Sequence, residues 1–326
     1  MKTNPLDLYI CFLKKGLKMK HLFVINPASG KKDRSQEISA EIRSIFPTCA
    51  DAADSYEIYI TKAPLDATAK IRAAAAETAE PIRVYACGGD GTLNECVNGA
   101  ALQPNVSVTH YPCGTGNDFI KIFGDARKRF FDLKELIQGE TRTFDLIETC
   151  GRYSVNICSV GLDARIAADV HKYSNIPVIG GATGYVVSLI VNLFKGLSQP
   201  LRFSGCGYEF DGKATLVCAC KGQYYGGGFH PFPQARPDNG TLDFLILKAI
   251  HLWEFPAMIG KYASGHWDKL PKDKVVHLQG THLQIESPQD IVVNVDGEAI
   301  FHKSINFDLV PGGVRFVVPK GIEYAP

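Results

Sequence analysis

The feature that most restricts the fold of this chain is an alternation of apolar strand-like runs and helix-like runs near its N-terminus. Strand patterns occur at residues 21–26, 56–61 and 82–87, and helical patterns at residues 38–46, 66–80 and 92–101. Alternation of this kind produces a parallel sheet that is covered on both sides. We therefore predict an α/β domain with a parallel sheet and helices on both of its faces.

The pattern changes after about residue 142, where strand signals dominate. Asp211-Gly212 and Asp296-Gly297 predict tight hairpins, because Asp-Gly supplies the positive φ angles that such turns need. Further strand candidates lie at residues 217–220, 242–247, 283–286, 291–295, 305–310 and 314–318. We predict a mostly antiparallel β-sandwich domain, and we expect a ligand site in the cleft between the two domains.

The expected organisation has four parts. They are an unstructured extension at residues 1–18, an α/β domain at 19–142, a β-rich domain at 143–310, and a strand and tail at 311–326 that return to the first domain. Met19 is then an alternative start of the protein. The uncharged stretch at residues 172–195 is interrupted by Pro177 and several glycines, so a buried or surface-associating helix fits it better than a membrane span.

Charge and cysteine content exclude some classes of protein. Lysine and arginine number 35 against 34 aspartates and glutamates, which leaves a net charge of +1. This balance argues against nucleic acid as the main partner, and any membrane contact should be local and apolar. The ten cysteines form no Cys-x-x-Cys pair and follow no secretory signal, so we expect reduced thiols and a cytoplasmic location.

Three glycine-containing loops follow predicted strands. Residues 88–92 read Gly-Gly-Asp-Gly-Thr between a strand and a helix, where free N–H groups and the helix dipole attract phosphate. Thr92 and Glu95 also fit a capping box at the start of that helix. Residues 111–118 and 26–30 form the other two loops. Each alone could be a plain turn, but three at the carboxyl edge of one sheet predict a phosphate site.

Two nucleotide-binding motifs are excluded at these loops. The chain has no Gly-Lys-Ser/Thr, so residues 88–92 are not a Walker loop. Asn94 stands where a dinucleotide fingerprint has its third glycine. Backbone N–H groups and Mg²⁺ must therefore replace the Walker lysine if the chain binds a triphosphate.

Five segments occur in an order that resembles the diacylglycerol kinase catalytic-domain family, and within it the bacterial soluble lipid kinases. They are Asn-Pro-Ala-Ser-Gly at 26–30, Gly-Gly-Asp-Gly-Thr-Leu-Asn at 88–94, Pro-Cys-Gly-Thr-Gly-Asn-Asp-Phe at 112–119, Tyr-Tyr-Gly-Gly-Gly at 224–228 and Asp-Gly-Glu at 296–298. The resemblance runs from about residue 20 to the C-terminus. Gly-Gly-Asp-Gly-Thr alone is shared with phosphofructokinases and NAD kinases, whereas the five together are specific.

The resemblance implies an ATP- and Mg²⁺-dependent kinase that converts diacylglycerol to phosphatidic acid. Domain 19–142 would bind the nucleotide and domain 143–310 the lipid. The implied ATP-binding residues are Asn26, Pro27, Ala28, Ser29, Gly30, Thr61, Gly88, Gly89, Asp90, Gly91, Thr92, Leu93, Asn94, Thr115 and Asp118. Glu298 would be the catalytic base and Asp296 its assistant. From the residues alone, the alternative is a hairpin turn with an exposed glutamate.

The resemblance also implies a structural Mg²⁺ site. Its residues here would be Asp145, Arg236, Asn239 and Thr241, with backbone carbonyls from Arg236 and Thr241. Asn239 replaces the usual aspartate ligand, and an amide oxygen brings less charge to a cation. A second departure is Phe-Ile-Lys-Ile-Phe at residues 119–123, where relatives usually have Phe-Ala-Arg.

Several functional alternatives stay open at this point. Another lipid alcohol, such as phosphatidylglycerol or a sphingoid base, is a substrate of the same chemistry. A non-catalytic protein of this fold that binds lipid or nucleotide belongs to another class, although a pure binder has no need of Glu298. The NAD kinase segment Thr-Pro-Thr-Gly-Ser-Thr is absent. We expect transient peripheral contact with the inner face of the membrane, and we leave the oligomeric state open, with a homodimer among the alternatives.

Overall fold

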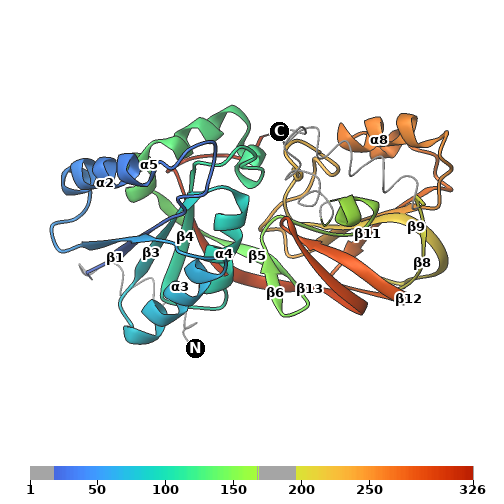
Figure 1. The fold of residues 1–326 in the computed structure, drawn as a ribbon, viewed down its shortest axis with the longest axis horizontal. Coiled ribbons are helices and arrows are strands. Elements are labelled where there is room, and N and C mark those ends of the chain that lie inside the picture. Colours follow the sequence, from blue (N-terminus) through green and yellow to red (C-terminus); the bar gives the residue numbers. More distant parts are fainter. Residues whose placement is uncertain (1–17, 167, 169–195, 326) are drawn as a thin grey trace, which may run out of the picture. The chain divides into compact units, whose positions relative to one another are not determined.

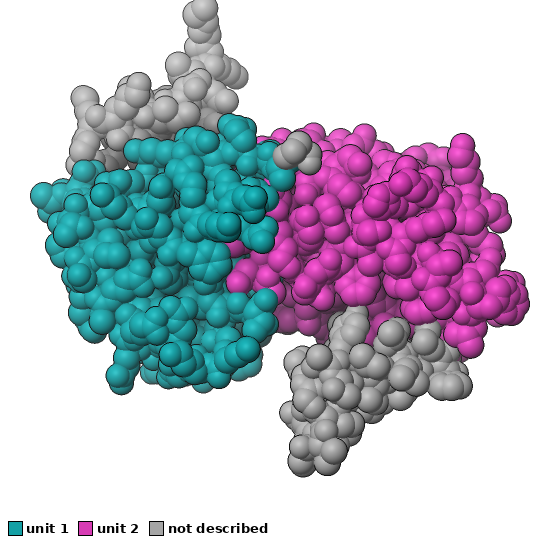
Figure 2. Space-filling model, turned by 90° about the horizontal axis from the view of Figure 1, so that it is seen from above, with its two compact units in different colours: residues 1–115, 123–143, 314–326 teal, residues 116–122, 144–313 magenta. Residues whose placement is uncertain are grey.

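The computed structural model describes residues 18–166, 168 and 196–325. The chain divides into two compact units (Figure 2). Unit 1 comprises residues 1–115, 123–143 and 314–326, and unit 2 comprises residues 116–122 and 144–313. Residues 1–17 of the expected extension and the expected helix within 172–195 lie outside the described residues.

Unit 1 contains a parallel sheet. Its strand order is β2 (Ser55–Ile60), β1 (Lys20–Ile25), β3 (Ile82–Gly88), β4 (Val106–Pro112) and β13 (Glu298–Val318). Every neighbouring pair in this order is parallel, and β13 joins through residues 315 and 316. All residues of β3 and β4 are buried, as expected for strands that are covered on both faces.

Helices cover both faces of this sheet. Figure 1 shows α2 (Ser35–Cys49) and α5 (Leu133–Ile137) on one face, and α3 (Asp66–Glu77) and α4 (Asp90–Ala100) on the other. The buried side of α2 carries Ile38, Ile42 and Phe46, whose spacing of four residues places them along one side of a helix. The predicted α/β architecture is confirmed.

Unit 2 is built mostly from antiparallel strands. They are β5 (Glu140–Thr149), β6 (Arg152–Ser154), β7 (Ile157–Gly161), β8 (Gln199–Gly205), β9 (Tyr208–Cys220), β10 (Leu242–Lys248), β11 (Val275–Gly280), β12 (His282–Val295) and most of β13. Its helices include α8 (Phe255–Ala263) and the short η2 (Trp267–Lys269), whereas η1 (Phe119–Phe131) is kinked at Gly124 and belongs partly to each unit.

Two long strands close the sheet of unit 2 around its core. β9 pairs with β8 over residues 208–214 and with β7 over residues 216–220. β12 likewise pairs with β8 over residues 284–286 and with β7 over residues 293–295. The sheet therefore folds over itself and buries an apolar cluster that includes Phe203, Phe244 and Phe307. The predicted β-sandwich class is confirmed.

One of the two predicted hairpins is wrong. Asp296 and Gly297, with φ angles of 48° and 99°, do join β12 to β13. The second Asp-Gly pair lies inside β9, where Asp211 pairs with Arg202 of β8. The turn comes earlier, at Cys206 and Gly207, which both have positive φ angles. Because Cys206 and Gly207 already make the turn, Asp211 and Gly212 pair with β8 and stay in extended conformation.

Residues 116–122 differ from the expected domain boundary, because they belong to unit 2. Two contacts account for this placement. The Asp118 carboxylate accepts a hydrogen bond from the Gly227 N–H at 2.8 Å, and the Phe119 ring contacts the Phe144 ring at 5.9 Å between centroids.

Within the described part of the chain, no helix is both long and apolar enough to cross a membrane.

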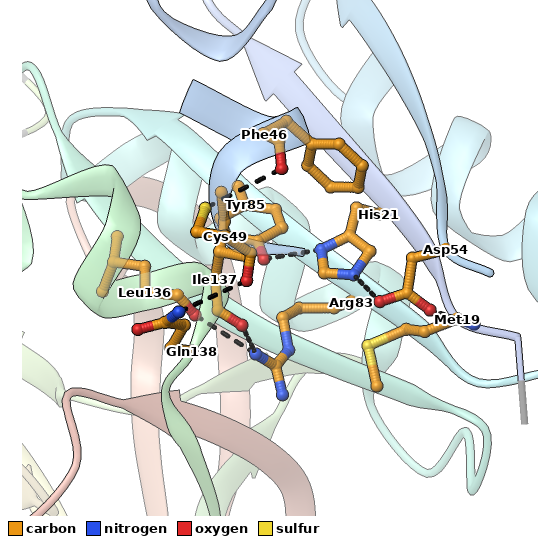
Figure 3. Close-up of polar contacts among 10 residues, drawn as sticks. All are labelled: Met19, His21, Phe46, Cys49, Asp54, Arg83, Tyr85, Leu136, Ile137 and Gln138. Carbon is orange, nitrogen blue, oxygen red and sulfur yellow. Dashed lines mark hydrogen bonds and ion pairs between the residues drawn. The ribbon is translucent and has the colours of Figure 1, made fainter. Parts of the chain in front are cut away.

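A buried polar cluster connects β1 and β3 with Asp54 and with the end of α5 in unit 1 (Figure 3). The His21 ring on β1 bonds to the Tyr85 hydroxyl at 2.8 Å and to the Asp54 carboxylate at 3.3 Å. Arg83 on β3 donates to the carbonyls of Leu136 and Ile137, at 3.2 and 2.5 Å. These carbonyls lie at the C-terminal end of α5, where helix carbonyls lack their usual partners one turn further on, so Arg83 supplies donors to them; the Leu136 carbonyl also accepts from the Gly139 N–H at 3.2 Å.

Burial is the main reason that the pKa of His21 falls to about 4; Arg83 lowers it further, and Asp54 opposes the shift. Between pH 6.5 and pH 4, His21 is therefore mostly protonated in the unfolded chain and mostly neutral in the folded chain. The free energy of unfolding consequently decreases as the pH is lowered through this range. We expect His21 to account for a loss of about 2 kcal/mol between pH 7 and pH 5. Urea unfolding of the wild type and of His21→Gln at both pH values measures this.

The variant should lose less stability on acidification than the wild type. His110, whose pKa burial also lowers to about 4, continues to contribute in both proteins. An equal loss in the two proteins would show that His21 is protonated to the same extent in the folded and unfolded chains.

Candidate functional site

Two of the loops predicted to bind phosphate, and the first part of the third, lie in contact within unit 1. A Cβ atom built on Gly30 would lie 2.7 Å from the carbonyl oxygen of Cys113. One built on Gly89 would lie 3.2 Å from the Gly114 Cα atom and 3.5 Å from the Ser29 hydroxyl. The first loop (26–30), the second (88–92) and residues 111–115 of the third (111–118) thus pack too closely for larger residues at these glycines, whereas residues 116–118 belong to unit 2. The predicted convergence of the loops is present in the structure.

Side chains of two predicted residues hold the loops together. The Asn26 amide donates to the Thr92 hydroxyl at 3.0 Å, and its carbonyl oxygen accepts from the Ala28 N–H at 3.0 Å. A Cβ atom on Gly88 would lie only 2.2 Å from the same Thr92 hydroxyl. Asn26 and Thr92 therefore shape the loops, and the main chain is left to face a ligand.

The helix after the second loop does not start as predicted. α4 begins at Asp90 with Gly89 as its N-cap residue, so Thr92 lies inside the first turn and makes no capping box. Glu95 instead accepts a hydrogen bond from the Ala67 N–H in the first turn of α3, at 3.2 Å. Glycine can cap α4 because its missing Cβ lets Gly114 approach.

The start of α4 suits an anion. The first N–H groups of a helix have no carbonyl partner within the helix, and the helix dipole adds positive potential there. Gly91 in this turn is exposed, and a Cβ atom built on it would meet nothing within 4 Å. A phosphate group can therefore approach the main chain at this position.

The other predicted nucleotide residues vary in placement. Thr61 follows β2, and its N–H donates to the Ile25 carbonyl at 2.9 Å, beside the first loop. Thr115 is exposed at the end of the third loop, and Pro27 is partly exposed in the first. Leu93 and Asn94 are buried in α4, at 2% and 4% exposure, so their side chains pack inside unit 1. Asp118 lies in unit 2, where it pairs with Lys121 and accepts from Gly227.

The predicted catalytic residues lie at the turn between β12 and β13. Asp296 accepts hydrogen bonds from the Ser154 hydroxyl at 2.7 Å and from the Ile157 N–H at 3.3 Å. Glu298 forms an ion pair with Arg152, and its side chain is 37% exposed. The turn thus holds one carboxylate against unit 2 and presents the other to solvent beside a guanidinium group.

No sequence pattern pointed to Arg152 and Ser154. They lie about 140 residues before the turn in the chain, and the pairing of Val295 with Cys158 brings β7 and the segment before it to β12. No local spacing encodes that contact.

Three of the four predicted metal-site residues bind a lysine. The Lys221 ammonium donates to the Asp145 carboxylate at 2.8 Å, to the Asn239 amide oxygen at 2.7 Å and to the Thr241 carbonyl at 2.9 Å. Arg236, the fourth predicted ligand, donates from its guanidinium to the Ala235 carbonyl at 3.2 Å. Lys221 directly follows β9, and nothing in the sequence connects it with Asp145. Asp145, Asn239 and Thr241 do not fit a magnesium ion, because the Lys221 ammonium already binds an oxygen of each.

The charge of Asp145 is well compensated. Burial alone would raise its pKa, but the Lys221 ammonium and the N–H groups of Gly312 and Gly240 outweigh that effect and lower it. The two N–H groups donate to its two oxygens, both at 2.9 Å. The carboxylate therefore links the end of β9, the 239–241 loop and β13.

Unit 2 also contains an apolar cavity of about 360 Å³. Its walls come from residues 162–166, β9, β10 and α8, and include Leu162, Leu216, Leu247, Phe255 and Ile259. The wall carries one carboxyl group, that of Asp163, whose pKa burial raises to about 6. A cavity of this composition is suited to hydrocarbon with a single polar contact.

Both parts of the chain match known protein families. The family described as "Diacylglycerol kinase catalytic domain" matches residues 20–149, and that described as "YegS C-terminal NAD kinase beta sandwich-like domain" matches residues 156–318. A Yersinia enterocolitica protein named "Probable lipid kinase YegS-like" is 27% identical over 310 residues, which cover 94% of this chain and 99% of that protein.

Two further proteins are similar. A Shewanella frigidimarina protein of the same name is 29% identical over 245 residues, which cover 73% of this chain and 76% of that protein. A solved structure of a diacylglycerol kinase from Bacillus anthracis strain Sterne matches with a TM-score of 0.68 at 21% identity, and covers 95% of this chain and 100% of that chain. That structure shows the same fold. The chain belongs to the diacylglycerol kinase catalytic-domain family and is a lipid kinase.

Proposed function

We propose that this lipid kinase transfers the γ-phosphoryl group of ATP, with Mg²⁺, to the hydroxyl group of diacylglycerol and forms phosphatidic acid. The observation that carries the proposal is the turn at residues 296–298. Asp296 is anchored by two hydrogen bonds, whereas the adjacent Glu298 is partly exposed at the start of a strand. A carboxylate held in this way can accept the proton of a substrate hydroxyl.

The loops of unit 1 support the nucleotide part of the proposal. The kinase family implies ATP as co-substrate, and phosphoryl transfer depends mainly on positioning and on charge stabilisation. The N–H groups at the start of α4 and the open space at Gly91 offer a place for phosphate oxygens. Mg²⁺ bound to the triphosphate would neutralise part of its charge, and Asp90 in the same turn is a carboxylate suited to hold it.

The proposed reaction has balanced proton and bond changes. The lipid oxygen bonds to the γ-phosphorus, the bond from that phosphorus to the bridging oxygen breaks, and ADP leaves. Glu298 accepts the hydroxyl proton. Arg152 stabilises the carboxylate charge before the transfer, and the contact of Ser154 with Asp296 keeps the turn in place.

The cavity of unit 2 supports a lipid acceptor. Its walls are almost entirely hydrocarbon, and burial of an acyl chain there would contribute about 0.8 kcal/mol per CH₂ group. A sugar or another water-soluble alcohol would lose its hydration in such a cavity without compensation.

One observation favours a sphingoid base as a second candidate. The Asp163 carboxyl group lies in the wall of this cavity, where the Ser159 and Tyr225 hydroxyls and the Ala164 N–H offset only part of the cost of burying its charge. The ammonium group of a sphingoid base would pair with this carboxylate and offset the cost of burying its charge.

We further propose that the segment before α8 makes peripheral contact with the membrane. Leu252 and Trp253 are 56% and 76% exposed, and α8 itself forms part of the cavity wall. Tryptophan is enriched at membrane–water interfaces, where its ring is apolar and its N–H group remains hydrated. An apolar contact here would place the cavity next to the lipid phase from which the substrate comes.

The role of Glu298 has a direct test. Glu298→Gln removes the proton acceptor but preserves size, so we expect kcat with diacylglycerol in mixed micelles to fall roughly 10²–10⁴-fold. Circular dichroism and ATP affinity should stay unchanged. The matched control is Glu209→Gln, at an exposed carboxylate in β9, which should retain full activity. Near-normal turnover of folded Glu298→Gln would refute the role of this residue.

The phosphate site has a test that separates binding from folding. Gly91→Ala places a methyl group in the open space over the first turn of α4, so we expect ATP affinity to fall at least about tenfold. Stability should stay equal or rise by about 0.5–1 kcal/mol, because alanine favours a helix. Gly88→Ala should reduce both quantities, since its methyl group collides with Thr92. Unchanged ATP affinity of Gly91→Ala would contradict the site.

The membrane contact is tested with the double variant Leu252→Ser, Trp253→Ser. We expect weaker sedimentation with phosphatidylcholine vesicles that contain diacylglycerol, and lower activity on them. Activity on soluble short-chain diacylglycerol should persist. Leu102→Ser is the control, because the exposure of Leu102, 60%, lies between those of Leu252 and Trp253, but Leu102 belongs to unit 1. Equal vesicle binding by the double variant and the wild type would exclude this segment.

A further inference from the structure

Lys221 occupies the centre of the site at which the family resemblance implies a divalent ion. Its side chain is fully buried, with 0% exposure. Its nitrogen has three oxygen partners at 2.7–2.9 Å, on Asn239, Asp145 and Thr241. These are a carboxylate, an amide and a main-chain carbonyl, which are the kinds of ligand that Mg²⁺ takes in proteins.

The geometry requires the charged form of the lysine. An ammonium group has three N–H donors, and each of the three oxygens takes one. The orientation of the Asn239 amide is fixed independently, because its oxygen also accepts from the Thr241 N–H at 3.3 Å. The oxygen of this amide, and not its NH₂ group, therefore faces Lys221.

The charges of the site match a monovalent cation. Lys221 contributes one positive charge and Asp145 one negative charge, and the other two partners, the Asn239 amide and the Thr241 carbonyl, are neutral. Asp243 and Asp238 also carry negative charge near Lys221 but act on it more weakly than Asp145, and Asp243 bonds to the His277 ring at 3.0 Å. An aspartate at position 239 would add a second negative charge, which a divalent ion would balance and a lysine would not. Lys221 and Asn239 are therefore a consistent pair.

A magnesium ion cannot share this site with Lys221. Mg²⁺ needs oxygen ligands at about 2.0–2.1 Å in octahedral arrangement, and it would repel an ammonium group that contacts the same oxygens. We propose that the Lys221 ammonium permanently replaces the structural metal ion of this site, so that unit 2 folds around a built-in cation and needs no divalent ion there.

The main chain at Lys221 also holds neighbouring segments, independently of the ammonium group. The main-chain N–H groups of Lys221 and Gly222 both donate to the Asn156 carbonyl at 2.8 Å. The Asn156 N–H in turn donates to the Ser154 hydroxyl at 3.1 Å. The lysine thus ties the end of β9 to the segment that anchors Asp296.

The test measures thermal stability of the full chain without nucleotide or lipid. We expect the melting temperature of the wild type to be the same in EDTA, in MgCl₂ and in CaCl₂. The double variant Lys221→Asn, Asn239→Asp restores a divalent-type ligand set, so its melting temperature should rise with MgCl₂ or CaCl₂ and fall with EDTA. Lys303→Asn, at an exposed lysine in β13, should behave like the wild type.

Two results would overturn the proposal. One is a wild-type melting temperature that falls in EDTA and recovers with MgCl₂. The other is Mg²⁺ bound stoichiometrically to the purified wild type by elemental analysis. Both measurements use the wild type, so they decide the question even where the double variant fails to fold. Because neither uses ATP or lipid, their outcome is independent of the proposed kinase substrate.

Discussion

The buried ion pair of Lys221 and Asp145 is the contact on which the functional part of unit 2 depends. It joins β5, the end of β9 and the 239–241 loop, and Asp145 also accepts from the Gly312 N–H on β13. Removal of one partner of such a pair typically costs about 3–5 kcal/mol, because the remaining charge stays buried. From Lys221, hydrogen bonds continue through Asn156 and Ser154 to Asp296. The turn with the proposed base is thus part of one connected network.

The two units carry different parts of the proposed chemistry. In unit 1, glycines allow three loops to pack closely, and Asn26 and Thr92 use their side chains to hold the loops. This arrangement leaves main-chain N–H groups for phosphate oxygens, which need no lysine. Unit 2 contributes fixed carboxylates and an apolar cavity. Phosphoryl transfer depends mainly on positioning and charge stabilisation, and in the proposed reaction hydrogen-bonded elements of each unit would supply them.

Local patterns in the sequence predicted the fold well, because strand and helix periodicity are short-range properties. They failed where two local signals competed: Cys206-Gly207 makes the turn, and Asp211-Gly212 stays within β9. They also failed for contacts that only strand pairing creates. Each such contact joins residues that are distant in the chain: Arg152 with Glu298, Ser154 with Asp296, and Lys221 with Asp145. Arginine and lysine are also mostly exposed residue types, so composition alone predicts surface positions for Arg152 and Lys221.

Product analysis tests the central claim most directly. The purified full-length protein is incubated with radiolabelled ATP, Mg²⁺ and a panel of diacylglycerol, phosphatidylglycerol, a sphingoid base and water-soluble alcohols. The account predicts label in the lipid fraction, with phosphatidic acid as the main product. Label that appears only in water-soluble acceptors would contradict it.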